Sequence, residues 1–536
     1  MTRHRWSDRT CSRVHAPAGS PSARVRHVSG ASGRLPAAAL AAAMAVAGTT
    51  AAQCRTEEAS ADATPVRPRT PDAPNSGLGA SPRVHEDAVM PPGHDSVTLP
   101  AFTHARGHGA LTAGGRGGDV LIVDTREDVV DEGDGVTSLR EALTVAVGPR
   151  TIVFAVGGLF DTSESMLVMS DEGDSHVTLA CQSAPPPGVR IRGQGLRIRG
   201  GVHDLIFRHC TFRNIDPGAP DAEVSRAIGV IGTAAPSARM IFDHLSLSWA
   251  TDENWTVFTG PDTKASSRGF TLSDSIVAEG DPDSAHPESG LLPRRYMHSM
   301  GPSCNSKSHR FPLLDCSIVG NLIAHNGRRN PLFWGASGEI VGNLVYNWYE
   351  TAVDARPHNS RTLDVQILGN EFRTGPTTKR GSTPLQVIVD DGPVDVRVEG
   401  NIERPFVDGR IGPPRRMEAI RQGSPSAPTT SPSPINLDCV GASRPSRDAV
   451  DERIVAELEN GTGTTGIGDD QERVYPYYPG TMHPPDYDLD RDGMADAWER
   501  KHGLDPTDPD DHRRDIDGDG YTALEEFVNA AATCPD

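Results

Sequence analysis

Short segments of alternating apolar and polar residues recur through the middle of the chain, and each follows a turn residue. Seven of them align: RHCTFRN, DHLSLSW, SDSIVAE, GNLIAHN, GNLVYNW, GNEFRTG and GNIERPF, which begin at residues 208, 243, 273, 320, 342, 369 and 400. Such alternation is typical of half-buried strands. Because no short strand buries its own apolar face, a strand that recurs every 22 to 47 residues predicts a solenoid of stacked β-coils.

The second position of every segment is polar and indicates a repeated corner. These positions are His209, His244, Asp274, Asn321, Asn343, Asn370 and Asn401. Asparagines at one corner are expected to hydrogen bond as a ladder, with His244 stacked on His209. The alternative is a β-sandwich with irregular loops, but a sandwich does not demand one residue type at one corner of each strand. We therefore predict an all-β solenoid.

Further elements are expected before the repeats. Residues 120–124 form a predicted strand, and a short helix follows that Thr137 or Ser138 opens and Glu141 caps. This helix would cover the open end of the solenoid. A further strand is predicted in TIVFAVGGLF, from Thr151.

Changes of composition divide the chain. The apolar stretch LPAAALAAAMAVAGTTAAQC follows an Arg-rich leader, so residues 1–52 are predicted to be a signal peptide, although an Ala-rich surface helix is the alternative. Residues 53–100 are a predicted disordered linker, 101–412 the β-solenoid, 413–480 a Pro/Ser-rich linker and tail, and 481–536 a separate module. No later stretch is apolar enough for a transmembrane span.

Charge and cysteines restrict the partners and the compartment. A net charge of −20 argues against nucleic acid, and against an acidic polymer unless bound cations or arginine clusters reverse the sign at the site. Export permits disulfides, and Cys304–Cys316 is the pair we expect first. The alternative is that Cys181, Cys210 and Cys316 are simply buried small hydrophobes.

Seven motifs in order carry a family resemblance. They are AGGRGG, TSLREAL, GPRTIVF, CQSAPPPG, FDHLSLSWATDEN, HSMG and AHNGRRNPLFWG, at residues 113, 137, 148, 181, 242, 298 and 324. From about residue 101 to 406, with a weaker match from 440, the chain resembles the pectate lyase-like polysaccharide lyases. The resemblance implies a right-handed parallel β-helix in a secreted, monomeric enzyme that cleaves pectate or polygalacturonate by calcium-assisted β-elimination.

That reaction needs two kinds of group. The weakly acidic proton beside the uronate carboxylate must be removed while the 4-O-glycosyl group leaves, and the carboxylate's own charge opposes this. A cation, typically Ca²⁺, spreads the developing charge, and a base must lie within hydrogen-bond reach of the proton.

The resemblance assigns the base to an Arg-x-Pro segment, here Arg329-Asn330-Pro331. An arginine ordinarily has a pKa above about 12, so Arg329 needs neighbouring charge and water exclusion to act as a base, or acts by stabilising the enolate-like intermediate. Arg328 is expected to supply charge to the substrate site. The alternative is that both arginines bind carboxylates of the protein surface.

For the groove cation, the resemblance points to Asp252 and Glu253. Two other family positions depart from the pattern, because Thr256 and Arg226 stand where ligands are expected. Asp221 and Glu223 are possible replacements, and Arg226 is itself a possible built-in substitute for the ion. We favour a structural role for Asp243 and His244.

The substrate contacts also differ from the family pattern. Trp334 stands where the family has a second arginine, and Met300, in HSMG, stands where the family's HSKG motif has its lysine. Arg294, Arg295 and His298 are predicted to bind substrate instead, although for His298 the alternative is a loop histidine whose hydrogen bonds are satisfied within the protein. These departures also motivate the alternative of a non-catalytic β-helix that binds polysaccharide or serves at a cell surface.

The tail carries two EF-hand-like loops. The first predicted ligand set is Asp488, Asp490, Asp492, Met494 through its carbonyl, Asp496 and Glu499, and the second is Asp515, Asp517, Asp519, Tyr521 through its carbonyl and Glu526. Glycine stands at position 6 of both loops, as Gly493 and Gly520. We expect structural calcium here; an acidic disordered tail is the alternative.

Overall fold

The computed structural model describes residues 99–534, apart from 132, 216–224, 233–234, 283–297, 309, 359–362, 389–391, 408 and 467–475. The predicted signal peptide, nearly all of the predicted linker, and Asp221, Glu223, Arg294 and Arg295 lie outside the described residues.

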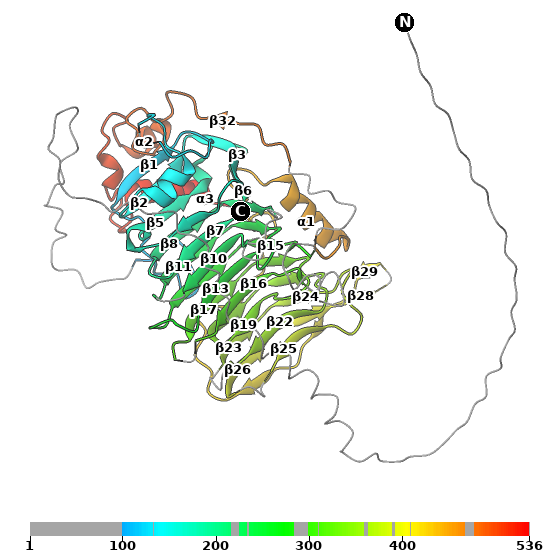
Figure 1. The fold of residues 1–536 in the computed structure, drawn as a ribbon. Helices are drawn as coiled ribbons and strands as arrows, with labels where there is room; N and C mark the ends of the chain where they lie inside the picture. Colours follow the sequence, from blue (N-terminus) through cyan, green and yellow to red (C-terminus); the bar gives the residue numbers. More distant parts are fainter. Residues whose placement is uncertain are drawn as a thin grey trace, which may run out of the picture. The chain divides into compact units, whose positions relative to one another are not determined.

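Three long sheets run along a right-handed parallel β-helix (Figure 1), as predicted. Sheet 1 contains β1 (Asp119–Val123), β2 (Arg150–Phe154), β5 (Val177–Ala180), β8 (His203–Arg208), β11 (Ala238–Asp243), β14 (Arg268–Ser273), β17 (Leu313–Val319), β20 (Ala336–Val341), β23 (Leu363–Leu368), β26 (Val394–Glu399) and β31 (Ile420–Gln422). Sheet 2 contains β4 (Leu167–Met169), β7 (Leu196–Arg199), β10 (Ile228–Gly232), β13 (Trp255–Thr259), β16 (Pro302–Ser306), β19 (Leu332–Trp334), β22 (Thr351–Arg356) and β25 (Thr383–Val387).

Sheet 3 contains β3 (Val156–Thr162), β6 (Val189–Gly193), β9 (Thr211–Asn214), β12 (Ser246–Ser248), β15 (Ile276–Ala278), β18 (Leu322–Ala324), β21 (Leu344–Tyr346), β24 (Glu371–Arg373), β27 (Ile402–Arg404), β30 (Arg415–Arg416) and β32 (Thr481–Met482). In the central coils the chain passes from sheet 1 to sheet 3 and then to sheet 2. Only the edge strands β30, β31 and β32 pair antiparallel among the described strands of these sheets. A small hairpin joins β28 (Phe406–Val407) to β29 (Arg410–Ile411).

The predicted asparagine ladder occupies the corner between sheets 1 and 3. Each Nδ2 donates to the next Oδ1, from Asn321 to Asn343 at 3.0 Å, from Asn343 to Asn370 at 3.0 Å and from Asn370 to Asn401 at 2.9 Å. All four side chains are buried. The ladder is therefore confirmed, and it satisfies polar groups that have no access to water.

Our alignment of the earlier coils was wrong by one residue. The strand register places Arg208, Asp243, Ser273 and Val319 level with one another. His209, His244 and Asp274 therefore correspond to Gly320, and all four have positive φ, between 47° and 68°. The residue that precedes Asn321 in the ladder is Ser275, whose backbone N–H donates to Asn321 Oδ1 at 2.9 Å. The predicted stacking of His209 on His244 is confirmed, with ring centres 4.8 Å apart.

The expected helix at the open end is present, but short. Residues 141–145 form a π-helical turn, η1 (Glu141–Val145), and Ser138 and Glu141 make the predicted reciprocal capping bonds. Leu139 and Leu143 enter the core beneath it. The single strand predicted from Thr151 is instead two strands, β2 and β3, because the chain turns at Ala155 from one sheet to another.

C-terminal segments cover the outer faces of two sheets. Helix α1 (Ala449–Asn460) packs Val450, Ile454 and Leu458 on apolar residues of β15, β18 and β21 in sheet 3. Helices α2 (Asp496–His502) and α3 (Ala523–Ala532) lie beside β1 and β2 (Figure 1), where Met494, Leu524 and Phe527 pack with Val153. Three 3₁₀ turns complete the described helices: Glu172–Asp174, Cys181–Ser183 and Asp511–Arg513.

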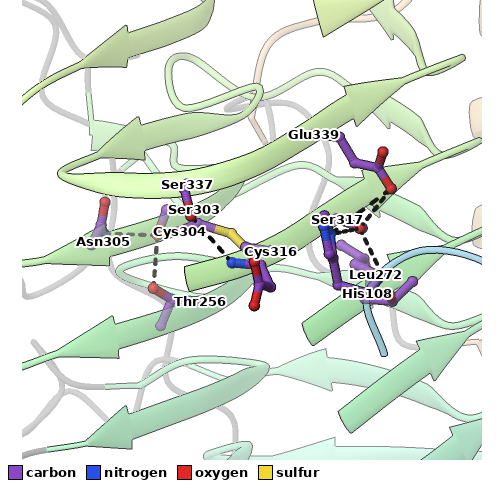
Figure 2. The surroundings of a disulfide bond; sticks show 12 residues. His108, Thr256, Leu272, Ser303, Cys304, Asn305, Cys316, Ser317, Ser337 and Glu339 are labelled. Atoms are coloured by element: carbon purple, nitrogen blue, oxygen red, sulfur yellow. Dashed lines mark hydrogen bonds and ion pairs between the residues drawn. A yellow bond between two sulfur atoms is a disulfide. The ribbon is translucent and has the colours of Figure 1, made fainter. Parts of the chain in front are cut away.

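Three disulfides join residues of the described chain: Cys181–Cys210, Cys304–Cys316 and Cys439–Cys534. The expected pair Cys304–Cys316 is confirmed, whereas the alternative of unpaired, buried Cys181, Cys210 and Cys316 is wrong. Figure 2 shows Cys304–Cys316 joining β16 of sheet 2 to β17 of sheet 1. None of the described helices is long and apolar enough to cross a membrane.

Replacing Asn343 by alanine is expected to destabilise the protein strongly. Asn343 accepts from Asn321, donates to Asn370 Oδ1 and donates to Ile318 O at 2.8 Å. Each buried group left without a partner costs about 1–3 kcal/mol, so Asn343→Ala should lower the unfolding midpoint in denaturant. Asn460→Ala on the surface of α1 is the control, and equal midpoints for the two variants would contradict the ladder's role.

Candidate active site

A cavity of about 160 Å³ opens on the outer face of sheet 2. Its floor consists of outward-facing residues in register across β13, β16, β19 and β22. One row is Phe258, Asn305, Trp334 and Arg356, which are successive Cα partners. The rim comes from the turns between sheets 3 and 2, which carry Arg226, Asp252, Glu253, Arg328 and Arg329. Asp252 and Arg329, 77 positions apart, therefore meet across two coil corners that are separated by the coil of β15 and β16.

The predicted catalytic residue Arg329 lies at one of these corners. It has a φ of 58°, and Glu253, on another coil, has a φ of 63°. Positive φ is uncommon for such residues. Arg329 Nη1 donates to Asp252 Oδ1 at 2.9 Å and also contacts Glu253 Oε1. The structure thus brings together the predicted base and both predicted groove ligands.

Arg226 completes this group from the opposite side. Its Nε lies 3.2 Å from Glu253 Oε2, and its Nη2 lies 3.5 Å from Asp252 Oδ2. Every oxygen of the two carboxylates therefore faces a guanidinium nitrogen. A calcium ion takes six to eight oxygen ligands, and these carboxylates already balance two cationic side chains. The predicted groove calcium on Asp252 and Glu253 does not fit this arrangement.

Three buried asparagines connect the two corners. Asn254 Nδ2 donates to Asn326 Oδ1 at 3.1 Å, and Asn326 Nδ2 donates to Asn330 Oδ1 at 3.1 Å. Asn254 follows Glu253 and Asn330 follows Arg329, so this amide chain fixes the backbone on which both charged side chains stand. Our sequence reasoning missed these residues; the signal was their place inside the TDEN and HNGRRN segments.

Arg328 lies beside Arg329 and lines the same cavity. Its Nε is 3.6 Å from Glu350 Oε2. Burial and the charge of Arg329 lower the pKa of Arg328. Burial also raises the pKa of Asp354 on the cavity floor, although Arg356 and Arg328 act against this. The cavity is therefore a place where positive charges are crowded and partly desolvated.

The remaining predicted groove residues occupy different depths. His298 is 1% exposed, does not line the cavity, and lies with Nε2 4.0 Å from Asp252 Oδ1. His298 therefore lies beside Asp252, and its predicted contact with substrate stays a prediction. Met300 is also buried, whereas Trp334 lines the cavity with Arg356 5.4 Å and Lys307 5.8 Å from its ring centre. Thr256 shares a 2.7 Å hydrogen bond with Ser303, beside the disulfide (Figure 2).

The first tail loop brings carboxylates together. Oxygens of Asp488, Asp490 and Asp492 lie within 4.8 Å of one another, as do those of Asp492, Glu499 and Asp511. Asp511 was not predicted, because it lies outside the twelve-residue loop. Asp496 is turned elsewhere, accepting from the Leu489 N–H at 2.9 Å and pairing with Arg500 at 2.7 Å.

Several oxygens of these carboxylates, on Asp490, Asp492, Glu499 and Asp511, are buried without a hydrogen-bond donor among the described residues. Glu499 is fully buried, and neither Oε1 nor Oε2 has a hydrogen-bond partner among the described residues. Burial and neighbouring negative charges raise the pKa of Asp492 to about 8 and that of Glu499 to about 7. Gly493 has a φ of 92°, as the sharp turn of such a loop requires. The donor set is all oxygen and suits a hard divalent cation.

The second loop gathers Asp515, Asp517, Asp519 and Glu526 within the same distance limit. Gly520 repeats the turn with a φ of 98°. The position-7 residues Met494 and Tyr521 are both buried, and their backbone N–H groups donate to Asp492 Oδ1 and Asp519 Oδ1 at 2.9 Å. Their predicted carbonyl ligation stays a prediction.

No family model matches the chain. A probable pectate lyase C of Aspergillus fumigatus is 28% identical over 447 residues, covering 81% of this chain and 94% of the relative. A probable pectate lyase C of Neosartorya fischeri is 29% identical over 448 residues, covering 81% and 94%. A solved pectate lyase structure from Paenibacillus sp. 0602 is 13% identical, with a TM-score of 0.35, over 67% of this chain and 95% of that one.

Proposed function

We propose that this chain is an exported polysaccharide lyase that cleaves pectate- or polygalacturonate-type polymers by β-elimination. The observation that carries the proposal is the cavity on sheet 2, where Arg328 and Arg329 stand together at a coil corner. The names of the relatives, probable pectate lyases that match over most of both chains, support the same reaction. The disulfides suit an oxidising compartment outside the cell.

The charges of the cavity suit an acidic substrate. Five cationic side chains line it, namely Arg226, Lys307, Arg328, Arg329 and Arg356, against the three carboxylates of Asp252, Glu253 and Asp354. The local sign is thus opposite to the net charge of the chain, −20. Guanidinium groups bind carboxylates with matching geometry, so the groove can hold successive uronates of one polymer.

In the proposed reaction, the C5–H bond of the uronate breaks and its proton passes to an arginine of the Arg328–Arg329 pair that has first lost its own proton to solvent, a neutral guanidine that thereby becomes a guanidinium. The electron pair forms the C4=C5 double bond as the C4–O bond breaks, and the leaving oxygen takes a proton from solvent. Arg329 is our candidate for proton transfer or for stabilising the enolate-like intermediate. The lowered pKa of Arg328 means that its positive charge is unfavourable at this corner, because the side chain is buried beside Arg329. A substrate carboxylate bound there would stabilise that positive charge.

The direct test is incubation with polygalacturonate while the ultraviolet absorbance of the unsaturated product is followed. A rise proportional to enzyme concentration is expected. The second candidate function, polysaccharide binding without cleavage, is favoured by the half-buried Trp334 between Lys307 and Arg356. Binding of several uronate polymers with no absorbing product from any of them would establish that alternative.

We further propose that the two tail loops bind calcium for structure. The supporting observations are the buried, unpaired oxygens of Glu499 and the two carboxylate groups described above. Because α2 and α3 pack on β1 and β2, the cations would hold the module that covers the first coils of sheet 1. Metal that binds only the folded state stabilises that state.

Chelation is therefore expected to loosen the tail before the β-helix. Excess chelator should add an early unfolding transition and expose bonds after about residue 480 to protease, and Glu499→Gln should reproduce part of this in calcium. At a hundredfold excess of ion over its dissociation constant the stabilisation is about 2.7 kcal/mol. Asp486→Asn, at an exposed position beside the loop, is the control. An unchanged melting profile in chelator would contradict structural calcium in this tail.

A further inference from the structure

The two groove carboxylates and two guanidiniums form a neutral set of side chains. Glu253 and Asp252 retain 4% and 15% of their side-chain exposure, and Arg226 and Arg329 retain 19% and 25%. Two negative charges in this partly buried place are balanced by two positive ones. A divalent cation that binds these carboxylates would have to displace a guanidinium from them. The displaced guanidinium would then lie close to the metal, and the repulsion between the two positive charges is strong in a partly buried place.

The fold provides a path for Arg226. It stands just before β10, and a Cβ added to Gly229 would lie 2.8 Å from Arg226 Cδ. Because Gly229 has no side chain, the aliphatic part of Arg226 can pass over this position on the outer face of sheet 2. Gly229 is the Cα partner of Thr256, which lines the same cavity. The backbone of this coil therefore allows the Arg226 side chain to extend toward Asp252 and Glu253.

We propose, resting on the proposed β-elimination, that Arg226 is the built-in cation of this groove and that the groove acts without a bound metal. Arg226 and Arg329 together hold Asp252 and Glu253, and the cationic excess of the cavity binds uronate carboxylates directly through guanidinium groups. Calcium is then needed for the tail and not for the chemistry. Arg226 is a positioning residue in this scheme, because it orients the carboxylates that orient Arg329.

The test compares the full-length protein with Arg226→Asp. Calcium bound per chain is measured by titration calorimetry, and lyase activity is measured in chelator and in calcium, while circular dichroism confirms the fold. The unchanged protein should keep its activity in chelator within about twofold, as long as it stays folded. Arg226→Asp should bind one more calcium ion per chain, lose at least about tenfold in chelator, and regain activity on calcium addition. Arg226→Lys, which keeps the charge, should create no calcium site.

Two results would overturn the inference. The first is a lower calcium count for the Asp252→Asn variant than for the unchanged protein. The lost ion would then be one that binds in the groove. The second is that chelator abolishes the activity of the folded protein and calcium restores it. The Glu499→Gln/Glu526→Gln variant, which lacks ligands in both tail loops, would have to show the same loss and recovery. If no uronate polymer is cleaved under any condition, the proposed function fails, whereas the calcium count still decides the role of Arg226.

Discussion

Arg329→Lys is expected to lower kcat on polygalacturonate at least about a hundredfold while the β-helix stays folded. Arg329 contacts both Asp252 and Glu253 through Nη1. Lysine keeps the positive charge but has one nitrogen in place of the planar guanidinium, so it cannot contact these carboxylates and the substrate through separate nitrogens. Groups that transfer the proton contribute about 10² to 10⁴ in rate. Initial rates of unsaturated product formation measure the loss.

The matched control is Arg397→Lys, a half-buried arginine paired with Glu399 on β26. It should keep normal turnover. The circular dichroism spectrum and the unfolding midpoint distinguish a chemical loss from a folding defect, since Arg329 also holds a corner of the coil. Near-normal turnover in a folded Arg329→Lys would remove Arg329 from the reaction and leave Arg328, its neighbour in the cavity, as the arginine to replace next.

The coil architecture was predictable because it repeats. Alternation identified the strands, and the recurring Gly-Asn pairs identified a corner whose asparagines do form a ladder. The register of the earlier coils was not predictable from polarity alone. His209 and His244 are as polar as Asn321, but they occupy the left-handed position that Gly320 holds in later coils. Only the hydrogen-bonded strand register separates the two positions.

The residues of the site could be predicted from the sequence, but the ion pairs among them could not. Motif order identified Arg329, Asp252 and Glu253, because each lies in a segment that the resemblance marks. That Arg226 and Arg329 hold opposite sides of the same carboxylates depends on which turns stack, and spacing along the chain does not contain that information. Asp511 was missed for a similar reason, since it reaches Glu499 from outside the loop pattern.

The second large effect concerns a buried ion cluster that joins α1 to sheet 3. Arg213 of β9 donates to Asp448 at 3.0 Å and to Asp451 at 2.7 Å, and the exposure of the three side chains is 1%, 0% and 0%. Burial would lower the pKa of Arg213, but the charges of Asp448 and Asp451 outweigh it and raise that pKa. Asp448 is also the N-cap of α1, so one guanidinium anchors the start of the helix.

Arg213→Ala is therefore expected to lower the free energy of unfolding by about 3–5 kcal/mol, because it leaves two buried carboxylates without their cation. Denaturant unfolding followed by tryptophan fluorescence measures the change, and protease cleavage near residue 447 should report early release of α1. Adding Asp448→Asn and Asp451→Asn to Arg213→Met should recover part of the loss, since no buried charge then remains unpaired. If Arg213→Ala unfolds at the same denaturant concentration as the unchanged protein, the cluster does not hold α1 to the β-helix.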